Sequence, residues 1–184
     1  MHITVALKTM SKRPSLLARL QDTGTKLIFG KDGGTDKDAF YDIVDRDMDG
    51  NDVKMATFKG NVLCVVNVAG FKILAFPCNQ FGAQEPGSHG EILDFVERKF
   101  GAKDKFTWFE KGHVNGTKTR EVYSYLKNKL PSDDGTSDIR WNFAKFLIDH
   151  EGNPVSRYGS KTNPEDMTSD IEGLLKKMED AARG

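Results

Sequence analysis

Cysteine is scarce in this chain, since Cys64 and Cys78 are the only two among its 184 residues. Two thiols without further cysteine or histidine clustering argue against a disulfide scaffold and against a zinc site. A chain of this length can bury roughly 70% of its unfolded surface, so it needs no such staple. We therefore expect a reducing compartment, no metal and no resident cofactor.

Net charge is also absent, because 27 Lys and Arg residues balance 27 Asp and Glu residues. A nucleic-acid-binding protein normally carries a concentrated basic face, and the sequence shows none. Apolar runs are short as well, far below the roughly 20 residues that a membrane-spanning helix requires. The sequence therefore predicts no nucleic-acid partner and no integral membrane segment, and it leaves the oligomeric state open.

Acidic residues are absent from residues 1–21, where basic residues alternate with Ser and Thr. The basic residues are Lys8, Lys12, Arg13 and Arg19, and the leucines that could share one helix face are Leu16, Leu17 and Leu20. This composition is typical of an organellar transit peptide, and a disordered basic tail is the alternative. We assign residues 1–37 to an N-terminal extension and residues 38–184 to one domain. The protein is then cytoplasmic, or mitochondrial or plastid-located if the extension is a transit peptide.

Two apolar runs lie at the centre of the domain, and we expect both to be buried strands. They are Val62–Val68 and Phe71–Phe76, and only Ala69 and Gly70 separate them. The second run continues into a loop rich in Gln, Asn and Gly. Open α/β sheets place their chemistry in such loops, at the carboxyl ends of strands.

The remaining segments predict a mixed α/β sheet with helices on both faces. Helices are expected from Ser88, where Glu91 completes a capping box, to Gly101, over Thr119–Leu130, and from Asn163 onward. Strands are expected over Phe40–Val44, Val53–Met55, Ile139–Ile148 and Val155–Tyr158, the first two as a hairpin and the last two antiparallel. Trp141 and Phe143 would share one face of their strand.

Four segments, in the same order along the chain, resemble motifs of the glutathione peroxidase family. Phe76–Gly87, FPCNQFGAQEPG, resembles the signature loop, and Val65–Ala69 resembles the strand that leads to the active site. Val114–Gly116 and Arg140–Phe146 match later motifs. The resemblance covers roughly Phe40 to Leu175 and is specific, because several motifs agree in order. It implies a thioredoxin-like fold and the reduction of hydrogen peroxide or organic and lipid hydroperoxides in defence against oxidative stress.

The resemblance also implies site residues and a co-substrate. In the family, a selenocysteine or cysteine attacks the peroxide oxygen, and glutathione or thioredoxin then reduces the oxidised residue. The supporting Gln, Trp and Asn of the family correspond to Gln84, Trp141 and Asn142. Amide and indole N–H groups suit this role, because they stabilise an anion without supplying a proton that titrates near neutrality.

The family's nucleophile has no counterpart here. In the family, the strand ending in Asn-Val-Ala continues into Ser-Lys-Cys-Gly, or its selenocysteine form, and a helix. In this chain Ala69 is followed at once by Gly70-Phe71. Parallel neighbouring strands normally need a crossover of about a dozen residues. The sequence therefore predicts an antiparallel hairpin or one bent strand at Ala69–Gly70, and an apolar sheet face left exposed.

Neither cysteine is expected to replace the nucleophile. Cys64 lies in mid-strand, where desolvation raises a thiol pKa, and Cys78 is expected to be a half-buried thiol. Family members that use thioredoxin carry a second, resolving cysteine, whose position here falls near Glu97. Because no cysteine lies there, the sequence excludes a two-cysteine cycle. We hypothesise that the missing segment was lost from the gene model around an in-frame selenocysteine codon.

Three functions remain open on this basis. The first is a thiol-dependent peroxidase of glutathione peroxidase type, catalytically impaired in the chain as written. The alternative is a non-catalytic splice form or pseudoenzyme of that family that acts as a binding module. A third is a thioredoxin-fold scaffold with a new activity at Cys78.

Overall fold

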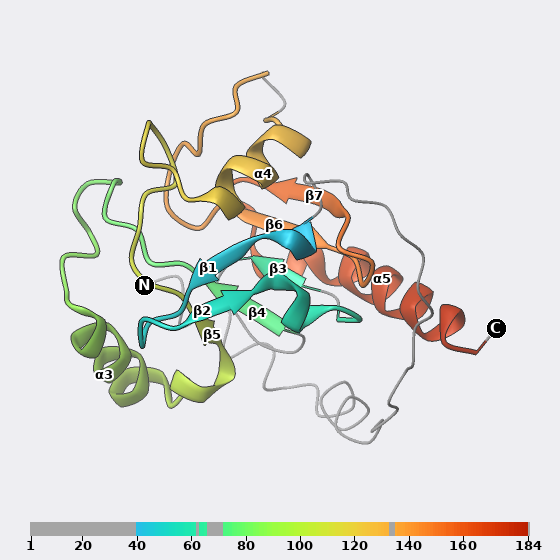
Figure 1. Cartoon of the computed structure of the whole chain (residues 1–184), viewed down its shortest axis with the longest axis horizontal. Helices are drawn as coiled ribbons and strands as arrows, with labels where there is room; N and C mark the ends of the chain where they lie inside the picture. Colours follow the sequence, from blue (N-terminus) through green and yellow to red (C-terminus); the bar gives the residue numbers. More distant parts are fainter. Residues whose placement is uncertain (1–39, 62, 66–71, 133–134, 184) are drawn as a thin grey trace.

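The computed structural model describes residues 40–61, 63–65, 72–132 and 135–183 (Figure 1). Within these residues a five-stranded sheet has the order β5-β4-β3-β6-β7, and a two-stranded sheet pairs β1 with β2. The strands are β1 (Val44–Arg46), β2 (Asp52–Lys54), β3 (Leu63–Val65), β4 (Lys72–Ala75), β5 (Thr107–Trp108), β6 (Lys145–Ile148) and β7 (Pro154–Tyr158). β3, β4 and β5 are parallel, and β6 and β7 run antiparallel.

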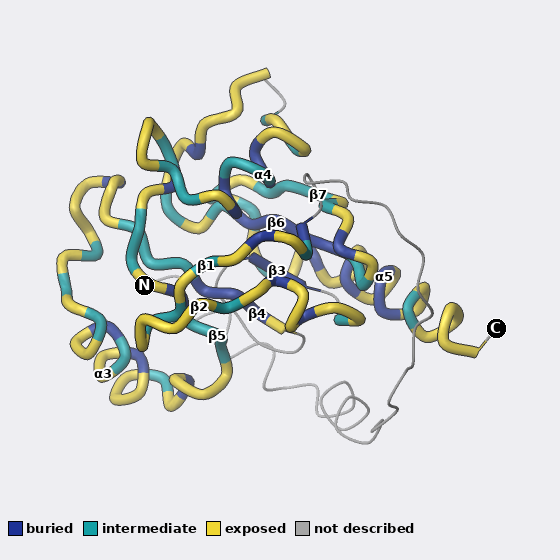
Figure 2. The backbone as a smooth tube through the Cα atoms, viewed as in Figure 1, coloured by how far each residue is buried: buried dark blue, intermediate teal, exposed yellow. Residues whose placement is uncertain are grey.

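Helices cover both faces of the larger sheet, as the sequence predicts. Leu63 and Val65 of β3 belong to the core cluster that includes residues of α4 (Glu121–Lys129). Cys64 points to the other face and packs in a cluster with α5 (Thr168–Ala181). The strands between the two clusters are buried on both sides (Figure 2). Four short 3-10 helices complete the described elements: η1 (Phe40–Asp42), η2 (Met55–Phe58), η3 (Lys103–Lys105) and η4 (Pro164–Met167).

Local capping signals predict the helix ends correctly. α3 (His89–Phe100) begins after Ser88, whose backbone N–H donates to the Glu91 carboxylate at 2.7 Å, and it ends at Gly101 in the left-handed conformation. Asn163 caps η4 through a second capping box and so starts the C-terminal helical segment. These caps satisfy backbone N–H groups that a helix start leaves without partners, which explains why they were readable in the sequence.

Two expected strands begin later than predicted, since β1 starts only at Val44 and β6 only at Lys145. Phe40 to Asp42 is a 3-10 helix, because Phe40 is buried in the core and the Tyr41 hydroxyl donates to the His150 carbonyl at 2.9 Å. The hairpin itself is confirmed, as β1 and β2 pair antiparallel. β6 begins only at Lys145, since Phe143 adopts φ of +63°, a left-handed conformation that a strand does not contain.

The predicted antiparallel hairpin or bent strand between β3 and β4 is wrong. The two strands are parallel neighbours, with Leu63 opposite Lys72 and Val65 opposite Leu74. Both strands are short, so Val65 and Lys72, which flank the undescribed residues 66–71, lie only about 8 Å apart by strand geometry. The Ala69–Gly70 joint itself lies outside the described residues.

The expectation of an exposed apolar face is also wrong for the described strands. Cys64 and Ile73, which are opposite each other on β3 and β4, are both buried.

No helix in the described part of the chain is long and apolar enough to cross a bilayer.

Candidate functional site

The loop after β4 is held by one glutamine side chain. Gln80 Oε1 accepts hydrogen bonds from the backbone N–H groups of Val114 at 2.8 Å and Asn115 at 3.0 Å. Gln80 Nε2 donates to the Asn115 carbonyl at 3.0 Å. The signature loop and the Val114–Gly116 motif, which are separate in the sequence, therefore form one unit.

A lysine fixes the far end of the same loop. Lys111 Nζ donates to the backbone carbonyls of Glu85, Pro86 and Gly87, at 3.2, 3.2 and 2.5 Å. Burial raises the pKa of the Glu85 carboxyl, and the nearby Lys111 cation partly opposes that rise. The loop thus presents a half-buried acid beside a cation that its own backbone already binds.

Asn115 also connects this loop to the segment before β6 through side-chain hydrogen bonds. Its Nδ2 donates to the Ile139 carbonyl at 2.7 Å, and its Oδ1 accepts from the Ile139 N–H at 2.9 Å. Lys127 Nζ donates to the same Oδ1 and to Asp138 Oδ1, each at 3.1 Å. These contacts position residues 139–142, just ahead of the left-handed turn at Phe143.

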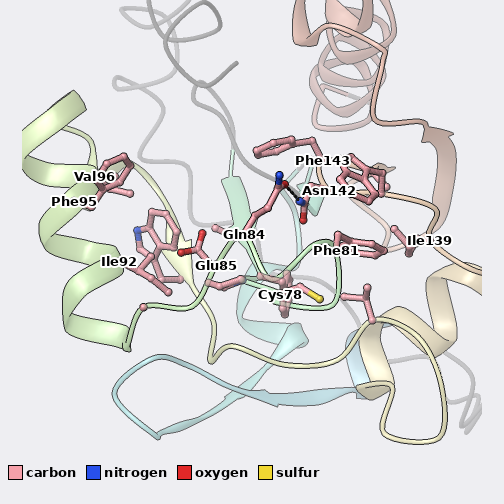
Figure 3. Close-up of a pocket in the computed structure, with 18 of the residues that line it drawn as sticks. Cys78, Phe81, Gln84, Glu85, Ile92, Phe95, Val96, Ile139, Asn142 and Phe143 are labelled. Carbon is pink, nitrogen blue, oxygen red and sulfur yellow. Dashed lines mark hydrogen bonds between the residues drawn. The ribbon is translucent and has the colours of Figure 1, made fainter. Parts of the chain in front are cut away.

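The three predicted site residues come together at this point. Asn142 Nδ2 donates to Gln84 Oε1 at 2.9 Å (Figure 3). The Trp141 ring lies 6.0 Å from the Phe81 ring, centroid to centroid, and a Cβ on Gly82 would lie 3.5 Å from Trp141 and 3.6 Å from Gln84. Trp141 does not lie on a strand and is 47% exposed, so its expected place on a strand face is wrong. The catalytic roles of these three residues stay predictions.

A cavity of about 620 Å³ opens beside these residues. Gln84 and Asn142 line one side, and Ile92, Phe95 and Val96 of α3 line the other (Figure 3). Most of the described lining is apolar or aromatic. Such a cavity suits a largely apolar ligand that a few polar groups orient.

The two cysteines differ in access. Burial raises the pKa of the Cys64 thiol to about 12, against a smaller opposing effect of Lys145, so the prediction of a desolvated Cys64 is confirmed. Cys78 lines the cavity, and its Sγ accepts the Gln80 backbone N–H at 3.5 Å. Among the described residues no group of histidine, cysteine and acidic side chains is arranged to hold a metal ion.

Sequence reasoning missed Gln80, Lys111, Asn115 and Lys127 as positioning residues. Gln80 and Asn115 carried a usable signal, because each lies inside a motif that the resemblance singled out. Lys111 and Lys127 carried none, since a lysine that binds backbone carbonyls or a buried amide has the same sequence signature as a solvated one.

Comparison with known proteins agrees with this geometry. A family model described as glutathione peroxidase matches residues 69–127. Glutathione peroxidase 1 of Helianthus annuus is 43% identical over 162 residues, covering 76% of this chain and 95% of that protein. The probable phospholipid hydroperoxide glutathione peroxidase 6, mitochondrial, of Arabidopsis thaliana is 38% identical over 182 residues, covering 85% and 77%. The crystal structure of Trgpx in apo form superposes with a TM-score of 0.59 at 29% identity, covering 75% of this chain and 95% of that chain.

The mixed sheet with its flanking helices is a thioredoxin-like fold, the class to which that neighbour points. The chain belongs to the glutathione peroxidase family, which comprises oxidoreductases that act on peroxides.

Proposed function

We propose that this site serves the thiol-dependent reduction of hydroperoxides, and that the chain as written performs it at a negligible rate. The observation that carries the proposal is the contact between Gln84 and Asn142, beside Trp141, at the wall of an apolar cavity. These side chains supply neutral N–H donors at the place where a thiolate or selenolate and a peroxide oxygen would meet.

The reaction needs an attacking anion that this chain does not supply. In the family's chemistry the anion bonds to one peroxide oxygen, the O–O bond breaks, and the other oxygen leaves as an alcohol or water after protonation. Two thiols then reduce the sulfenic or selenenic acid, and water and a disulfide are released. Cys64 cannot take this part, because its raised pKa leaves almost no thiolate near neutrality.

The alignment with the Helianthus annuus protein supports a missing segment. The match runs over 162 residues but covers 76% of this chain, which is about 140 of its 184 residues. About twenty positions of that relative therefore have no counterpart here, the order of a strand-crossing helix with its loops. The family-model match also begins at residue 69, beside the Ala69–Gly70 joint.

The assay is peroxide-dependent oxidation of glutathione or thioredoxin by the purified full chain, followed through NADPH consumption by the matching reductase. The expected rate equals that of the C64S/C78S variant, which has no thiol. Robust turnover that is lost in C78S would instead assign the nucleophile to Cys78. Sequencing of the native transcript tests the origin of the gap. A continuous message that lacks these codons, translated as such, would contradict the gene-model hypothesis and favour the pseudoenzyme.

The cavity also favours the second function, a binding module that holds a hydroperoxide without reducing it. Its apolar lining and the Gln84–Asn142 pair would remain competent for binding when the nucleophile is absent. Equilibrium binding of an organic hydroperoxide, unchanged in C64S/C78S and weakened in Q84A, would support this function. Failure to bind any hydroperoxide would exclude it.

The N-terminal extension supports an organellar location for the domain that begins at residue 38. Residues 1–21 are basic and free of acids, and a relative from Arabidopsis thaliana is named as mitochondrial. Fusion of residues 1–37 to a fluorescent reporter tests this part. A diffuse cytoplasmic signal would contradict it.

A further inference from the structure

Exposed apolar side chains in this molecule gather at the cavity. Five large hydrophobic residues are exposed among those described, and Phe95, Trp141 and Phe143 all line this one cavity. Phe95 comes from α3, and Phe143 lies across the cavity from it (Figure 3). An apolar hollow of this kind on an otherwise polar surface marks a binding site for an apolar partner.

Two acidic side chains, and no basic one, are among the described lining residues of this hollow. The charged residues in its described lining are Glu85 and Glu91. Hydrogen bonds from Ser88 lower the pKa of Glu91, which therefore stays ionised at neutral pH. Lys111 is the neighbouring cation, and three backbone carbonyls already bind its ammonium group. The lining therefore favours an occupant that combines an apolar face with positive charge.

The chain itself contains a segment of that chemistry. Residues 12–20 carry Lys12, Arg13 and Arg19 without an acid, and Leu16, Leu17 and Leu20 are spaced for one helix face. Leu20 precedes the first described residue, Phe40, by about twenty residues, which can span up to about 66 Å when extended. Phe40 packs in the core cluster that contains Phe81, a residue of the cavity wall. The segment can therefore reach the cavity from where the described chain begins.

We propose that residues 12–20 dock their leucine face into this cavity, against Phe95, Trp141 and Phe143, with their cations toward Glu85 and Glu91. Tethering raises the local concentration of the segment to the millimolar range, so a weak contact suffices. This inference does not depend on whether the chain reduces peroxides.

Tryptophan fluorescence reports on the cavity directly, because the chain has two tryptophans and both Trp108 and Trp141 line it. The test compares the full chain with L16E/L17E/L20E. The matched control is L27E/I28E/F29E, which adds the same charge to the other apolar run of the extension. The triple leucine variant is expected to shift the emission to the red by several nanometres and roughly double the acrylamide quenching constant, whereas the control leaves both unchanged.

Two results would overturn the proposal. One is the same emission and quenching in L16E/L17E/L20E as in the parent chain, and the other is an equal change in L27E/I28E/F29E. Emission that changes on a roughly hundredfold dilution would identify a second copy as the occupant and would also overturn intramolecular docking. Thermal unfolding by circular dichroism checks that both variants keep the parent's folded domain, because their substitutions lie in the extension and outside residues 38–184.

Discussion

Cys64 lies within β3, whereas Cys78 follows the end of the neighbouring strand β4, and the two thiols have opposite surroundings. Cys64 is in the body of β3, buried against α5, where burial raises its pKa to about 12. Cys78 comes after the end of β4, lines the cavity and accepts a backbone N–H. The contrast shows what a strand and a loop each allow. A strand buries its side chains between two helical layers, whereas the loop at its carboxyl end presents them to a ligand.

The two strands also differ in the connection that leaves each carboxyl end. β3 and β4 are parallel and so end at the same edge of the sheet. After β4 the chain forms a long loop that Gln80 and Lys111 fix in place. After β3 only residues 66–71 precede the next strand. Gln84, a proposed supporting residue, therefore lies in the fixed loop after β4, and the segment that we propose to be missing would leave the same edge after β3.

The largest expected effect comes from restoring the β3 connection. A chimaera that carries, between Ala69 and Gly70, the corresponding segment of the Helianthus annuus relative should gain peroxidase activity on the order of 10⁴-fold over the parent chain. This expectation follows from our proposal that Gln84, Trp141 and Asn142 act as the donors and that the chain lacks only the attacking anion. The coupled NADPH assay measures the gain.

The control for the chimaera is the same insert with its cysteine replaced by serine, which should stay at background. Gln84→Ala in the active chimaera should lower the rate about a hundredfold, as loss of one preorganised donor does. If the chimaera is active and neither the cysteine-to-serine insert nor Gln84→Ala lowers its rate, the reaction does not take place at the inserted cysteine beside Gln84. Trapping of a sulfenic acid on the inserted cysteine checks that the segment reaches the site.

The second effect concerns thiol reactivity. At pH 8 a pKa of about 12 leaves Cys64 with at least about 10³-fold less thiolate than an ordinary thiol. Cys64 should therefore react with a maleimide at least 10³-fold more slowly in the folded protein than in urea, on the order set by that thiolate fraction. Cys78 should change by less than about tenfold. Site-resolved mass spectrometry of timed samples separates the two rates.

Comparable maleimide rates at Cys64 and Cys78 in the folded protein would contradict the burial of the Cys64 thiol between β3 and α5. A Cys78 that reacts far faster than a free thiol would revive a function centred on that residue.

The helix ends were readable from the sequence, whereas the direction of β4 relative to β3 was not. Ser88, Glu91 and Asn163 act through hydrogen bonds within a few residues, so their pattern is local. The contact of Gln84 with Asn142 was reachable through the family resemblance alone, because the two lie far apart in the chain.

Tertiary contacts decided what the sequence could not. The run from Ile139 to Ile148 has strand chemistry throughout, but Asn115 binds Ile139 and Phe143 turns left-handed, so β6 starts late. The parallel pairing of β3 and β4 escaped prediction for a different reason. Parallel neighbours normally need a crossover of about a dozen residues, whereas only residues 66–71 separate β3 from β4 in the sequence, so the crossover rule argued against this pairing.

The third effect is a loss of stability in alkaline solution. The pKa of Cys64 is raised on folding from 9.0 to about 12, so its contribution to stability is fully present well below pH 9 and declines as the pH rises from 9 toward 12. Between pH 8.5 and 10 the free energy of unfolding should fall by roughly 1 kcal/mol through Cys64. Urea titrations across that range measure the slope.

Cys64→Ala should remove most of this slope below about pH 9.5, and Cys78→Ala should keep it. Burial also raises the pKa values of Tyr41 and Tyr158 from 10.0 to about 12 and raises that of Tyr123, so their own contributions fall mainly above pH 10. An unchanged slope in Cys64→Ala would show that another buried group titrates in this window.

The smallest expected effect is a loss of stability when Gln80, in the loop after β4, is replaced. Gln80→Ala removes the acceptor of two backbone N–H groups, at Val114 and Asn115, and the donor to the Asn115 carbonyl. Because Val114 is buried, water replaces its lost partner poorly, and we expect a loss of about 1 kcal/mol in the free energy of unfolding. Asn79→Ala is the matched control, since it removes one bond to the Glu85 N–H within the same loop and should cost about half as much.

The two variants also separate stability from positioning. Asn115 contacts both Gln80 and Ile139, so loss of Gln80 should disturb the segment that carries Trp141, whereas loss of Asn79 should not. Tryptophan emission should therefore shift in Gln80→Ala and stay at the parent value in Asn79→Ala. If both variants lose stability equally and neither moves the emission, the loop is held by its own backbone rather than by Gln80. The conformation of the Phe76–Gly87 loop would then depend on the turn at Gly82 and Ala83, whose φ angles are +64° and +50°.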